Sequence, residues 1–347
     1  MAHGGIRNRR RHRRREWFAA GVAATLVTAV AATAQVTTAG GGSLLVWPKI
    51  VADGTQDTVI ELVNRTNRRV DVTCYYLRGD DASCAFSPFA VVLTRQQPTH
   101  WRASAGRSVT PGDPECSPSN NECDGAGTDP GAVPVVPSGF TGALLCFETD
   151  ATGSPLAGNS LAGWATVSGR VTADTARYDA VAFPASGEVM LPADVLNLDG
   201  TEYAACPATW SANHAVDGSF DPLVGDTSSI SNRLTILPCT LELNGTPTMV
   251  NLDFSLQDEL GQTFGSATTV SCWADLTLGA LASGFTFAEL GSFYARTTVT
   301  SDPGVMIVHE DVRVPGASLA PTTAIGNPHH AGSRAGVGGD QITLPVP

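Results

Sequence analysis

The sequence is nearly devoid of lysine, since Lys49 is the only one among 347 residues. Charged residues of all kinds make up 16% of the chain, below the ~25% typical of globular domains. Residues 1–34 hold seven arginines, and the 14 basic and 32 acidic residues of the remaining 313 leave a net charge of −18. Nucleic acids and anionic lipid surfaces both recruit basic patches. This charge balance therefore argues against a nucleic acid or a membrane surface as the partner.

The chain also lacks an apolar run long enough to cross a membrane. The longest, residues 17–30, falls short of the ~20 residues that a helical span needs. It follows an arginine-rich segment and precedes the small residues Ala32 and Ala34, which is the pattern of a cleaved export signal. We therefore expect residues 1–34 to be a signal peptide for either the general or the twin-arginine route. No transmembrane anchor is expected elsewhere.

Recognisable catalytic motifs are missing as well. The sequence has no G-x-S-x-G nucleophile elbow, no H-E-x-x-H pair and no glycine-rich phosphate loop. Residues 158–162 come close to the elbow and fail at the last position. No catalytic residue is assigned from the sequence, and we expect no bound organic cofactor.

All eight cysteines follow the signal, and an even number of cysteines in an exported chain predicts disulfides. No pair has the C-x-x-C spacing of a zinc site. Cys116 and Cys123 flank a short polar loop, which they can close locally. Cys239 and Cys272 each end or follow a β-like run and suit a cross-strand or inter-sheet bridge. The remaining four can pair in three ways, which the sequence leaves open: Cys74, Cys84, Cys146 and Cys206.

Strand-like patterns dominate the mature chain. Residues 70–77 alternate apolar and polar side chains, and residues 58–63 are rich in β-branched ones, both typical of strands. A turn cluster at residues 64–67 lies between them, so we expect a hairpin. Residues 44–48 are expected to form an edge strand that ends at a proline.

Further β-like runs are short and separated by turn signals. They are residues 89–94, 141–149, 163–171, 180–183, 187–191, 232–240, 248–257, 263–273, 292–300 and 305–314. We expect residues 232–240 and 248–257 to pair across a turn at 243–246, and short helices near 285–290. Such a succession of short strands predicts an all-β fold of immunoglobulin-like β-sandwich modules, two of them, stabilised by disulfides.

The predicted organisation has six parts. They are a signal peptide (1–34), a linker (35–43), a first β-sandwich region (44–109), a Cys/Pro/Gly-rich acidic loop or linker (110–139), a second β-sandwich region (140–315) and a disordered tail (316–347). The tail is assigned from its Gly, Pro, Ala and Ser content and its few large apolar residues.

The acidic loop is the candidate metal site. Calcium takes six to eight oxygen ligands in flexible geometry, and the loop concentrates such groups among glycines and prolines. The candidate ligands are Asp113, Glu115, Asn120, Glu122, Asp124 and Asp129. Calcium is therefore the one ion that the sequence suggests, and the alternative is an acidic loop that simply faces solvent.

Two resemblances bear on function. Residues 43–49, 62–66 and 70–76 resemble the first three strands of immunoglobulin-like periplasmic chaperones. That resemblance implies that Lys49, next to Pro48, holds the terminal carboxylate of a bound subunit. Residues 43–315 are more broadly similar to uncharacterised exported β-sandwich proteins of Gram-negative bacteria, which supply no activity. They share the motifs at residues 93–101, 140–146, 237–239 and 268–272.

His100 and Trp101 form a further candidate binding pair, because an imidazole next to an indole can orient a ligand. We expect an exported, non-catalytic structural, adhesive or binding protein of the cell envelope or exterior, with a protein or glycan partner. One alternative is a secreted glycan hydrolase that uses paired carboxylates. The other is a periplasmic assembly chaperone that offers an edge strand near Lys49.

Overall fold

Nearly all of the regular structure is β-strand, which confirms the predicted fold class. The computed structural model describes residues 35–38, 40–81, 83–108, 130–186, 194–221, 228–243, 245–315 and 320–345. Within them, the helices are three single turns: α1 (Leu278–Leu281), the 3-10 turn η2 (Ser283–Phe285) and α2 (Phe287–Leu290). The expected short helices near residues 285–290 are thus confirmed. The predicted signal peptide and the strand expected at residues 187–191 lie outside the described residues.

The largest sheet has nine described strands and turns back on itself between β1 and β2. Its path is β4-β3-β6-β1-β2-β7-β8, with β5 paired to β2 and β9 to β1. β1 and β2 pair only through Ala52 and Asp57, so the two halves pack face to face around one hydrophobic core. We call this unit the first sandwich. Its strands are β1 (Leu44–Ala52), β2 (Gln56–Asn64), β3 (Val70–Arg78), β4 (Phe86–Leu93), β5 (Pro98–Arg102), β6 (Phe140–Thr149), β7 (Leu161–Gly169), β8 (Thr175–Asp179) and β9 (Val181–Phe183).

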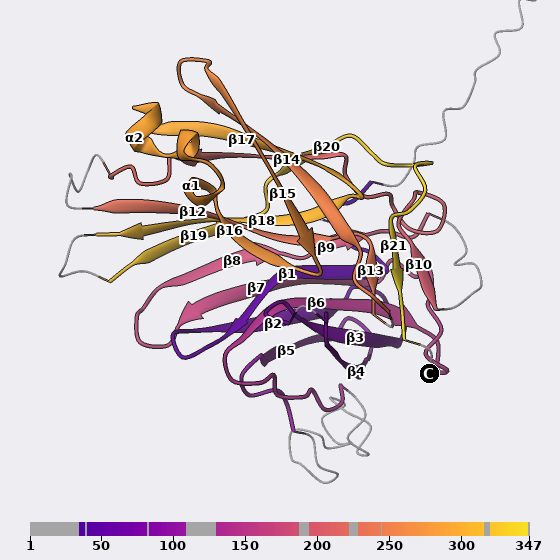
Figure 1. Cartoon of the computed structure of the whole chain (residues 1–347). Helices are drawn as coiled ribbons and strands as arrows, with labels where there is room; N and C mark the ends of the chain where they lie inside the picture. The colour runs from indigo at the N-terminus through magenta and orange to yellow at the C-terminus, as the bar shows by residue number, and fades with distance from the viewer. Residues whose placement is uncertain are drawn as a thin grey trace, which may run out of the picture. The chain divides into compact units, whose positions relative to one another are not determined.

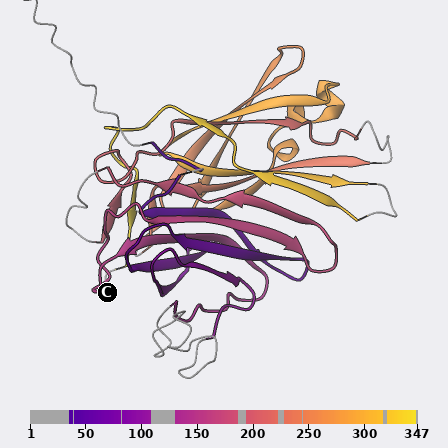
Figure 2. The ribbon, with the colours of Figure 1, turned by 180° about the vertical axis from the view of Figure 1, so that it is seen from behind.

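Two further sheets form the second sandwich, which is coloured from salmon to yellow in Figures 1 and 2. Leu234 and Ile307 of one sheet share a core with Phe254 and Val299 of the other. The four-stranded sheet consists, in order, of β16 (Ala274–Thr277), β12 (Ser229–Pro238), β18 (Val305–Val314) and β19 (Thr322–Gly326). The five-stranded sheet consists of β15 (Thr263–Ser271), β14 (Met249–Asp258), β17 (Tyr294–Asp302), β11 (Thr209–Ala215) and β20 (His329–Ala331).

β1 is the strand on which both cores meet. All nine of its residues are buried, as expected for a strand covered on both faces. It pairs with β6 on one side and β9 on the other, so the predicted edge strand ending at Pro48 is wrong. A register shift between Trp47 and Ile50 marks a bulge. Both of these residues enter the first core, and the extra residue turns Lys49 toward the second sandwich.

Neither predicted hairpin forms. β2 and β3 lie in one sheet with β6 and β1 between them, and β3 instead pairs with β4. β12 and β14 belong to different sheets of the second sandwich. A polar turn fixes only that the chain changes direction. Which strand becomes the neighbour depends on the burial of distant strands such as β1.

The described part of the predicted tail is ordered into strands, which corrects that prediction for residues 320–345. β19 pairs with β18, and β20 with β11. β21 (Gln341–Thr343) lies between β10 (Val195–Asn197) and β13 (Leu241–Glu242) in a third, small sheet. Its pairing with β13 is parallel. Ile342 and Leu344 are buried. The composition of this segment did not predict these strands, because they are ordered by pairing with strands from other parts of the sequence.

The two sandwiches do not divide where the sequence suggested. Strands β6–β9 follow the 110–139 segment and complete the sheet that β1–β5 begin, so the first sandwich extends to Phe183. Both sandwiches belong to a single compact unit, residues 33–347. The immunoglobulin-like topology stays a prediction.

Three disulfides tie the described strands together. Cys74–Cys146 links directly opposed residues of β3 and β6. Cys206–Cys239 links the entry of β11 to the exit of β12. Cys84–Cys272 joins the β3–β4 connection of the first sandwich to the β15–β16 turn of the second. The expected bridge between Cys239 and Cys272 is therefore wrong, and Cys116 and Cys123 lie outside the described residues.

The disulfides indicate an oxidising environment outside the cytoplasm, because cytosolic thiols are kept reduced. In the described ranges, none of the short helices has the length or apolar character to span a bilayer. The predicted location is thus supported at the level of an extracytoplasmic protein.

Candidate functional site

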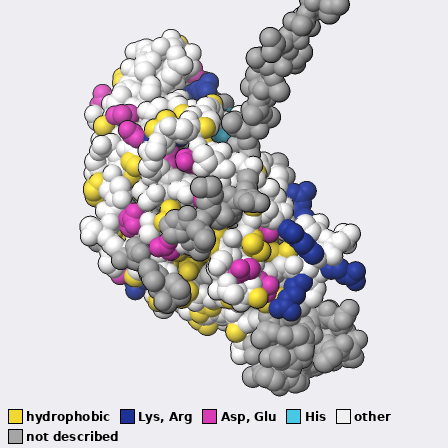
Figure 3. Space-filling model, turned by 90° about the vertical axis from the view of Figure 1, so that its right-hand side faces the viewer, with side chains coloured by type: hydrophobic (Ala, Val, Ile, Leu, Met, Phe, Trp, Pro, Cys, Tyr) yellow, Lys and Arg dark blue, Asp and Glu magenta, His cyan; other side chains and the backbone are white. Residues whose placement is uncertain are grey.

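Exposed arginines gather in two adjacent turns of the first sandwich. Arg65, Arg68 and Arg69 lie in the β2–β3 turn, and Arg95 lies in the β4–β5 turn. All four are exposed, and we call them the arginine patch. Figure 3 shows Lys and Arg side chains along one margin of the face that it displays. The patch is a local positive surface on a body whose net charge is negative.

Hydrogen bonds fix the backbone of both turns. The Asn64 side-chain amide donates to the carbonyls of Arg68 and Thr94, at 2.6 and 2.8 Å. Its carbonyl oxygen accepts from the Thr66 N–H at 2.9 Å, as short amide side chains do in turns. The Gln96 N–H donates to the Thr66 carbonyl, also at 2.9 Å. The backbone beneath the arginines is thus organised before any ligand arrives, and binding has to order only their side chains.

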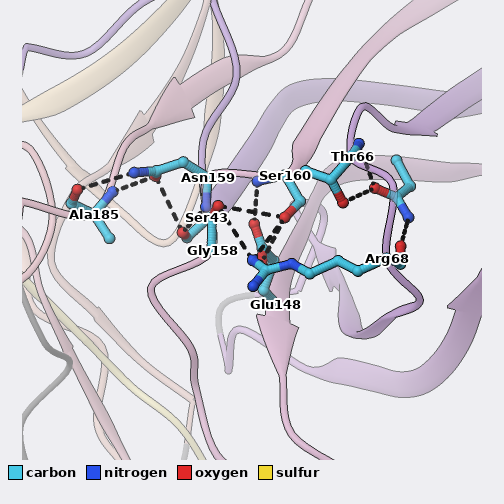
Figure 4. Close-up of polar contacts among 9 residues, drawn as sticks. Ser43, Thr66, Arg68, Glu148, Gly158, Asn159, Ser160 and Ala185 are labelled. Atoms are coloured by element: carbon cyan, nitrogen blue, oxygen red, sulfur yellow. Dashed lines mark hydrogen bonds and ion pairs between the residues drawn. The ribbon is translucent and has the colours of Figure 1, made fainter. Parts of the chain in front are cut away.

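Arg68 rests on a buried carboxylate (Figure 4). Glu148 of β6 is 2% exposed and accepts from the Ser160 N–H at 2.5 Å and the Ser160 hydroxyl at 3.1 Å. Nη2 of Arg68 lies 3.8 Å from Oε2 of Glu148 and 3.2 Å from Oγ of Ser160. Burial raises the pKa of Glu148, against the lowering effects of Ser160 and Arg68. Arg68 is therefore partly engaged, and it anchors the patch to the sheet.

The segment that carries Ser160 is itself held in place. Asn159 has a left-handed backbone with φ of 51°, which Asn tolerates better than most residues. Its side-chain oxygen accepts from the Ser43 hydroxyl at 3.1 Å and from the Ala185 N–H at 2.6 Å, as Figure 4 shows. Ser160 is fully buried. This segment, where the sequence narrowly misses a nucleophile elbow, is a structural support for the patch.

An open groove of about 480 Å³ lies between the two turns. It is lined by Asn67, Arg68, Arg69, Thr94 and Arg95. Arg69 approaches Asp71 at 3.4 Å, an exposed pair of the kind that contributes little in water. Within the described residues, no salt bridge joins Arg65 or Arg95 to a carboxylate. Of the three arginines that line the groove, Arg95 therefore makes no salt bridge with a described carboxylate, whereas Arg68 and Arg69 are exposed but partly engaged.

Sequence reasoning missed this patch. The available signal was that arginines recur inside two polar turn clusters, residues 64–69 and 94–97. Nothing local shows that the two turns are neighbours, because hydrogen bonds from Asn64 and Gln96 join them in the fold. Glu148 was missed too, since its burial follows from the position of β6 in the sheet.

Lys49, the predicted carboxylate anchor, is buried between the two sandwiches. Its Nζ lies 2.7 Å from Oε2 of Glu310 and 3.5 Å from Oδ2 of Asp275, and its side chain is 3% exposed. Arg233 pairs with the same oxygen of Asp275 at 3.0 Å. A paired ammonium at this depth cannot receive the terminal carboxylate of a partner. The predicted binding role of Lys49 is corrected to that of an internal ion pair.

His100 and Trp101 point to opposite sides of β5. His100 is exposed, whereas Trp101 is buried and donates from Nε1 to the Tyr76 hydroxyl at 2.6 Å. Alternation along a strand separates the two side chains, so they do not form the predicted binding pair. Trp101 belongs to the first core.

The predicted calcium ligands all lie outside the described residues: Asp113, Glu115, Asn120, Glu122, Asp124 and Asp129. In the ranges that the structure does describe, no three His, Cys, Asp or Glu side chains are grouped to hold a metal ion. Calcium binding by the acidic loop therefore stays a prediction.

A second group of ionisable side chains lies in the second sandwich, where His214 is buried and His309 and Asp311 are partly buried. The rings of His214 and His309 are 5.7 Å apart, and Nε2 of His309 lies 3.4 Å from Oδ1 of Asp311. Neither of those two atoms has a hydrogen-bond partner in the described part of the chain. Burial, together with nearby His214, lowers the pKa of His309 to about 4. Burial also raises the pKa of Asp311 to about 6.

Fold and site together define an extracytoplasmic, disulfide-linked all-β protein with an exposed arginine patch. No family model matches the chain, and no curated protein matches it. Among solved structures, the crystal structure of Thermotoga maritima 1070 is similar to 36% of this chain and 94% of that one, with 11% identity and a TM-score of 0.25. A similarity at that TM-score supports no conclusion about this chain.

Proposed function

We propose that this chain is an exported binding protein of the cell envelope or exterior, and that its arginine patch holds an anionic polysaccharide. The observation that carries the proposal is the groove between the two turns, where fixed backbone presents exposed guanidinium groups. Arginine pairs with carboxylate and sulfate groups through two parallel hydrogen bonds. The patch is therefore suited to the acidic groups of a polymer.

The lining of the groove favours a saccharide over a protein. Besides arginines it contains Asn67 and Thr94, whose amide and hydroxyl groups hydrogen-bond to sugar hydroxyls. The centres of protein–protein interfaces are instead enriched in aromatic and apolar anchors, and the groove is lined by none. An acidic glycan is thus the better match to the chemistry.

The net charge of −18 after residue 34 limits how the ligand approaches. The acidic body repels a polyanion at long range, but charges more than about 8 Å apart are largely screened at physiological salt. The patch therefore acts at contact distance. This predicts slow, unsteered association and a complex that dissociates as salt screens the guanidinium contacts.

The chaperone alternative loses its basis, because Lys49 is buried and paired with Glu310. The structural and adhesive roles that the sequence also suggested fit a protein that attaches to an acidic polymer at the cell exterior. The proposed relationship to exported β-sandwich proteins of Gram-negative bacteria agrees with that location.

The test is calorimetric titration of the disulfide-bonded chain with polygalacturonate, with neutral dextran as the matched control. We expect heat of binding with polygalacturonate only, and an affinity that falls as salt is raised from about 50 to about 200 mM. Equal binding to both polymers, or none to polygalacturonate, contradicts the proposal.

A further inference from the structure

One strand of the second sandwich has an open edge. β15 is the terminal strand of the five-stranded sheet and pairs with β14 along its whole length, from Thr263 opposite Gln257 to Ser271 opposite Met249. No described strand pairs with its other side. Half of its backbone N–H and C=O groups therefore face outward, as a template for another strand.

The other edges of the described sheets are blunted. β4 contains Pro88, which cannot donate to a ladder. The remaining edge strands, such as β8, β19 and β16, span five residues or fewer. At β8, the Asn327 side chain additionally occupies the Asp179 backbone, accepting from its N–H at 3.0 Å and donating to its carbonyl at 2.9 Å. β15 has nine residues with neither proline nor charge, so among the edge strands that the structure describes it alone lacks these protections.

β15 is also held in an extended form that is ready to pair. Its inward residues pack into the second sandwich, where Val270 is buried and Phe264 contacts the core. The Ser266 hydroxyl donates to the Leu281 carbonyl of α1 at 3.0 Å. This contact fixes the inner side of the strand. Pairing along the outer edge therefore needs little further ordering.

We propose that two copies of this chain associate by antiparallel pairing of β15 with β15. A two-fold axis places the same strand opposite itself, and like charges at such positions would repel. The outward side chains of β15 are small and neutral, namely Thr263, Gly265, Ala267 and Thr269. An uncharged strand is thus complementary to its own copy, whereas it offers nothing to attract a charged partner strand. The contact is independent of the arginine patch.

One strand per copy makes a small interface, so the dimer is weak and depends on concentration. Each body is acidic, and salt should therefore strengthen the association by screening their mutual repulsion. This salt dependence is opposite in sign to that of the proposed polysaccharide binding. The two proposals can thus fail separately.

Sedimentation velocity over a concentration series tests the proposal. We expect the wild-type chain to shift toward dimer as concentration rises. Ala267→Lys, at the exposed centre of β15, should weaken the dimer at least about tenfold. Thr300→Lys adds the same charge to the exposed face of β17, away from the edge, and should leave dimerisation unchanged.

Circular dichroism should show the same spectrum for all three proteins, since both substituted positions are exposed. A wild-type chain that stays monomeric at every concentration overturns the proposal. So does an Ala267→Lys variant that dimerises like the wild type. If instead both lysine variants lose the dimer equally, the contact lies elsewhere and pairing through β15 is excluded.

Discussion

Lys49 and the arginine patch carry the same charge in opposite surroundings. The Lys49 side chain is 3% exposed and contacts two carboxylates between the sandwiches. Arg68 and Arg69 are 60% and 57% exposed in their turns, and Arg65 and Arg95 form no salt bridge with a described carboxylate. A buried, paired charge contributes to holding the fold, whereas an exposed charge that is unpaired or only loosely paired is available to a ligand. Surroundings, rather than residue type, therefore separate the structural cation from the binding ones.

The largest expected effect concerns the disulfide that joins the two sandwiches, between which Lys49 is buried. Cys84–Cys272 spans 188 residues of sequence between the sandwiches, whereas Cys206–Cys239 spans 33. Loop-closure entropy assigns about 5 kcal/mol to the first and about 4 kcal/mol to the second. Replacing Cys84 and Cys272 by serine should thus lower the free energy of unfolding more than replacing Cys206 and Cys239, as measured by denaturant titration. The reverse ranking would show that the Cys84–Cys272 bridge contributes less to the stability of the fold than Cys206–Cys239.

Breaking the Lys49 pair comes next. Lys49→Met leaves Glu310, which is 3% exposed, without its closest cation. Removing one partner of a buried pair costs about 3–5 kcal/mol, whereas replacing both by apolar residues is often neutral. We therefore expect Lys49→Met to melt well below the wild type, and Lys49→Met with Glu310→Leu to recover most of the loss. If Lys49→Met were as stable as the wild type, the Lys49–Glu310 pair would not contribute to holding the fold.

Asp311 provides a test of a partly buried carboxylate that lies next to His309. The unfolded chain protonates its histidine near pH 6.5, but folded His309 protonates only near 4, so acidification favours unfolding. Folded Asp311 takes up its proton near pH 6, above its unfolded value, so acidification there favours folding. The two effects oppose each other. Asp311→Asn removes the effect of Asp311 protonation. Between about pH 7 and about pH 5, its free energy of unfolding should therefore fall by about 1 kcal/mol more than that of the wild type.

Chemical denaturation at both pH values measures this difference, and other titrating groups cancel because they are common to the two proteins. Adding His309→Gln to Asp311→Asn should remove the contribution of His309, and the response that remains at this site is that of His214, whose pKa burial also lowers. Parallel pH profiles for the wild type and Asp311→Asn would show that the two side chains do not titrate as described.

Strand positions could be predicted from the sequence because alternation is local. The predicted run at residues 305–314 coincides with β18, and that at 70–77 with β3 apart from one residue. Pairing could not be predicted in the same way. Residues 58–63 and 70–77 are separated by a short turn, yet β1 and β6 lie between them, because β1 is covered on both faces.

The site was harder to predict than the fold. A local resemblance drew attention to Lys49, but the bulge in β1 turns that side chain inward toward Glu310. The arginine patch instead joins two turns about 30 residues apart in sequence, through the Asn64 bond to Thr94. Disulfide partners such as Cys84 and Cys272 are likewise fixed by how the sandwiches pack.

The most direct test of the binding role is the polygalacturonate affinity of Arg65→Gln with Arg69→Gln and Arg95→Gln. Arg68 is left in place because it contacts buried Glu148. Exposed charges contribute little to folding, so the melting temperature should stay within error of the wild type. Affinity should fall at least about tenfold, whereas Arg296→Gln, on the exposed face of β17, should bind like the wild type. An unchanged affinity in the triple variant would contradict the assignment of the patch as the binding site.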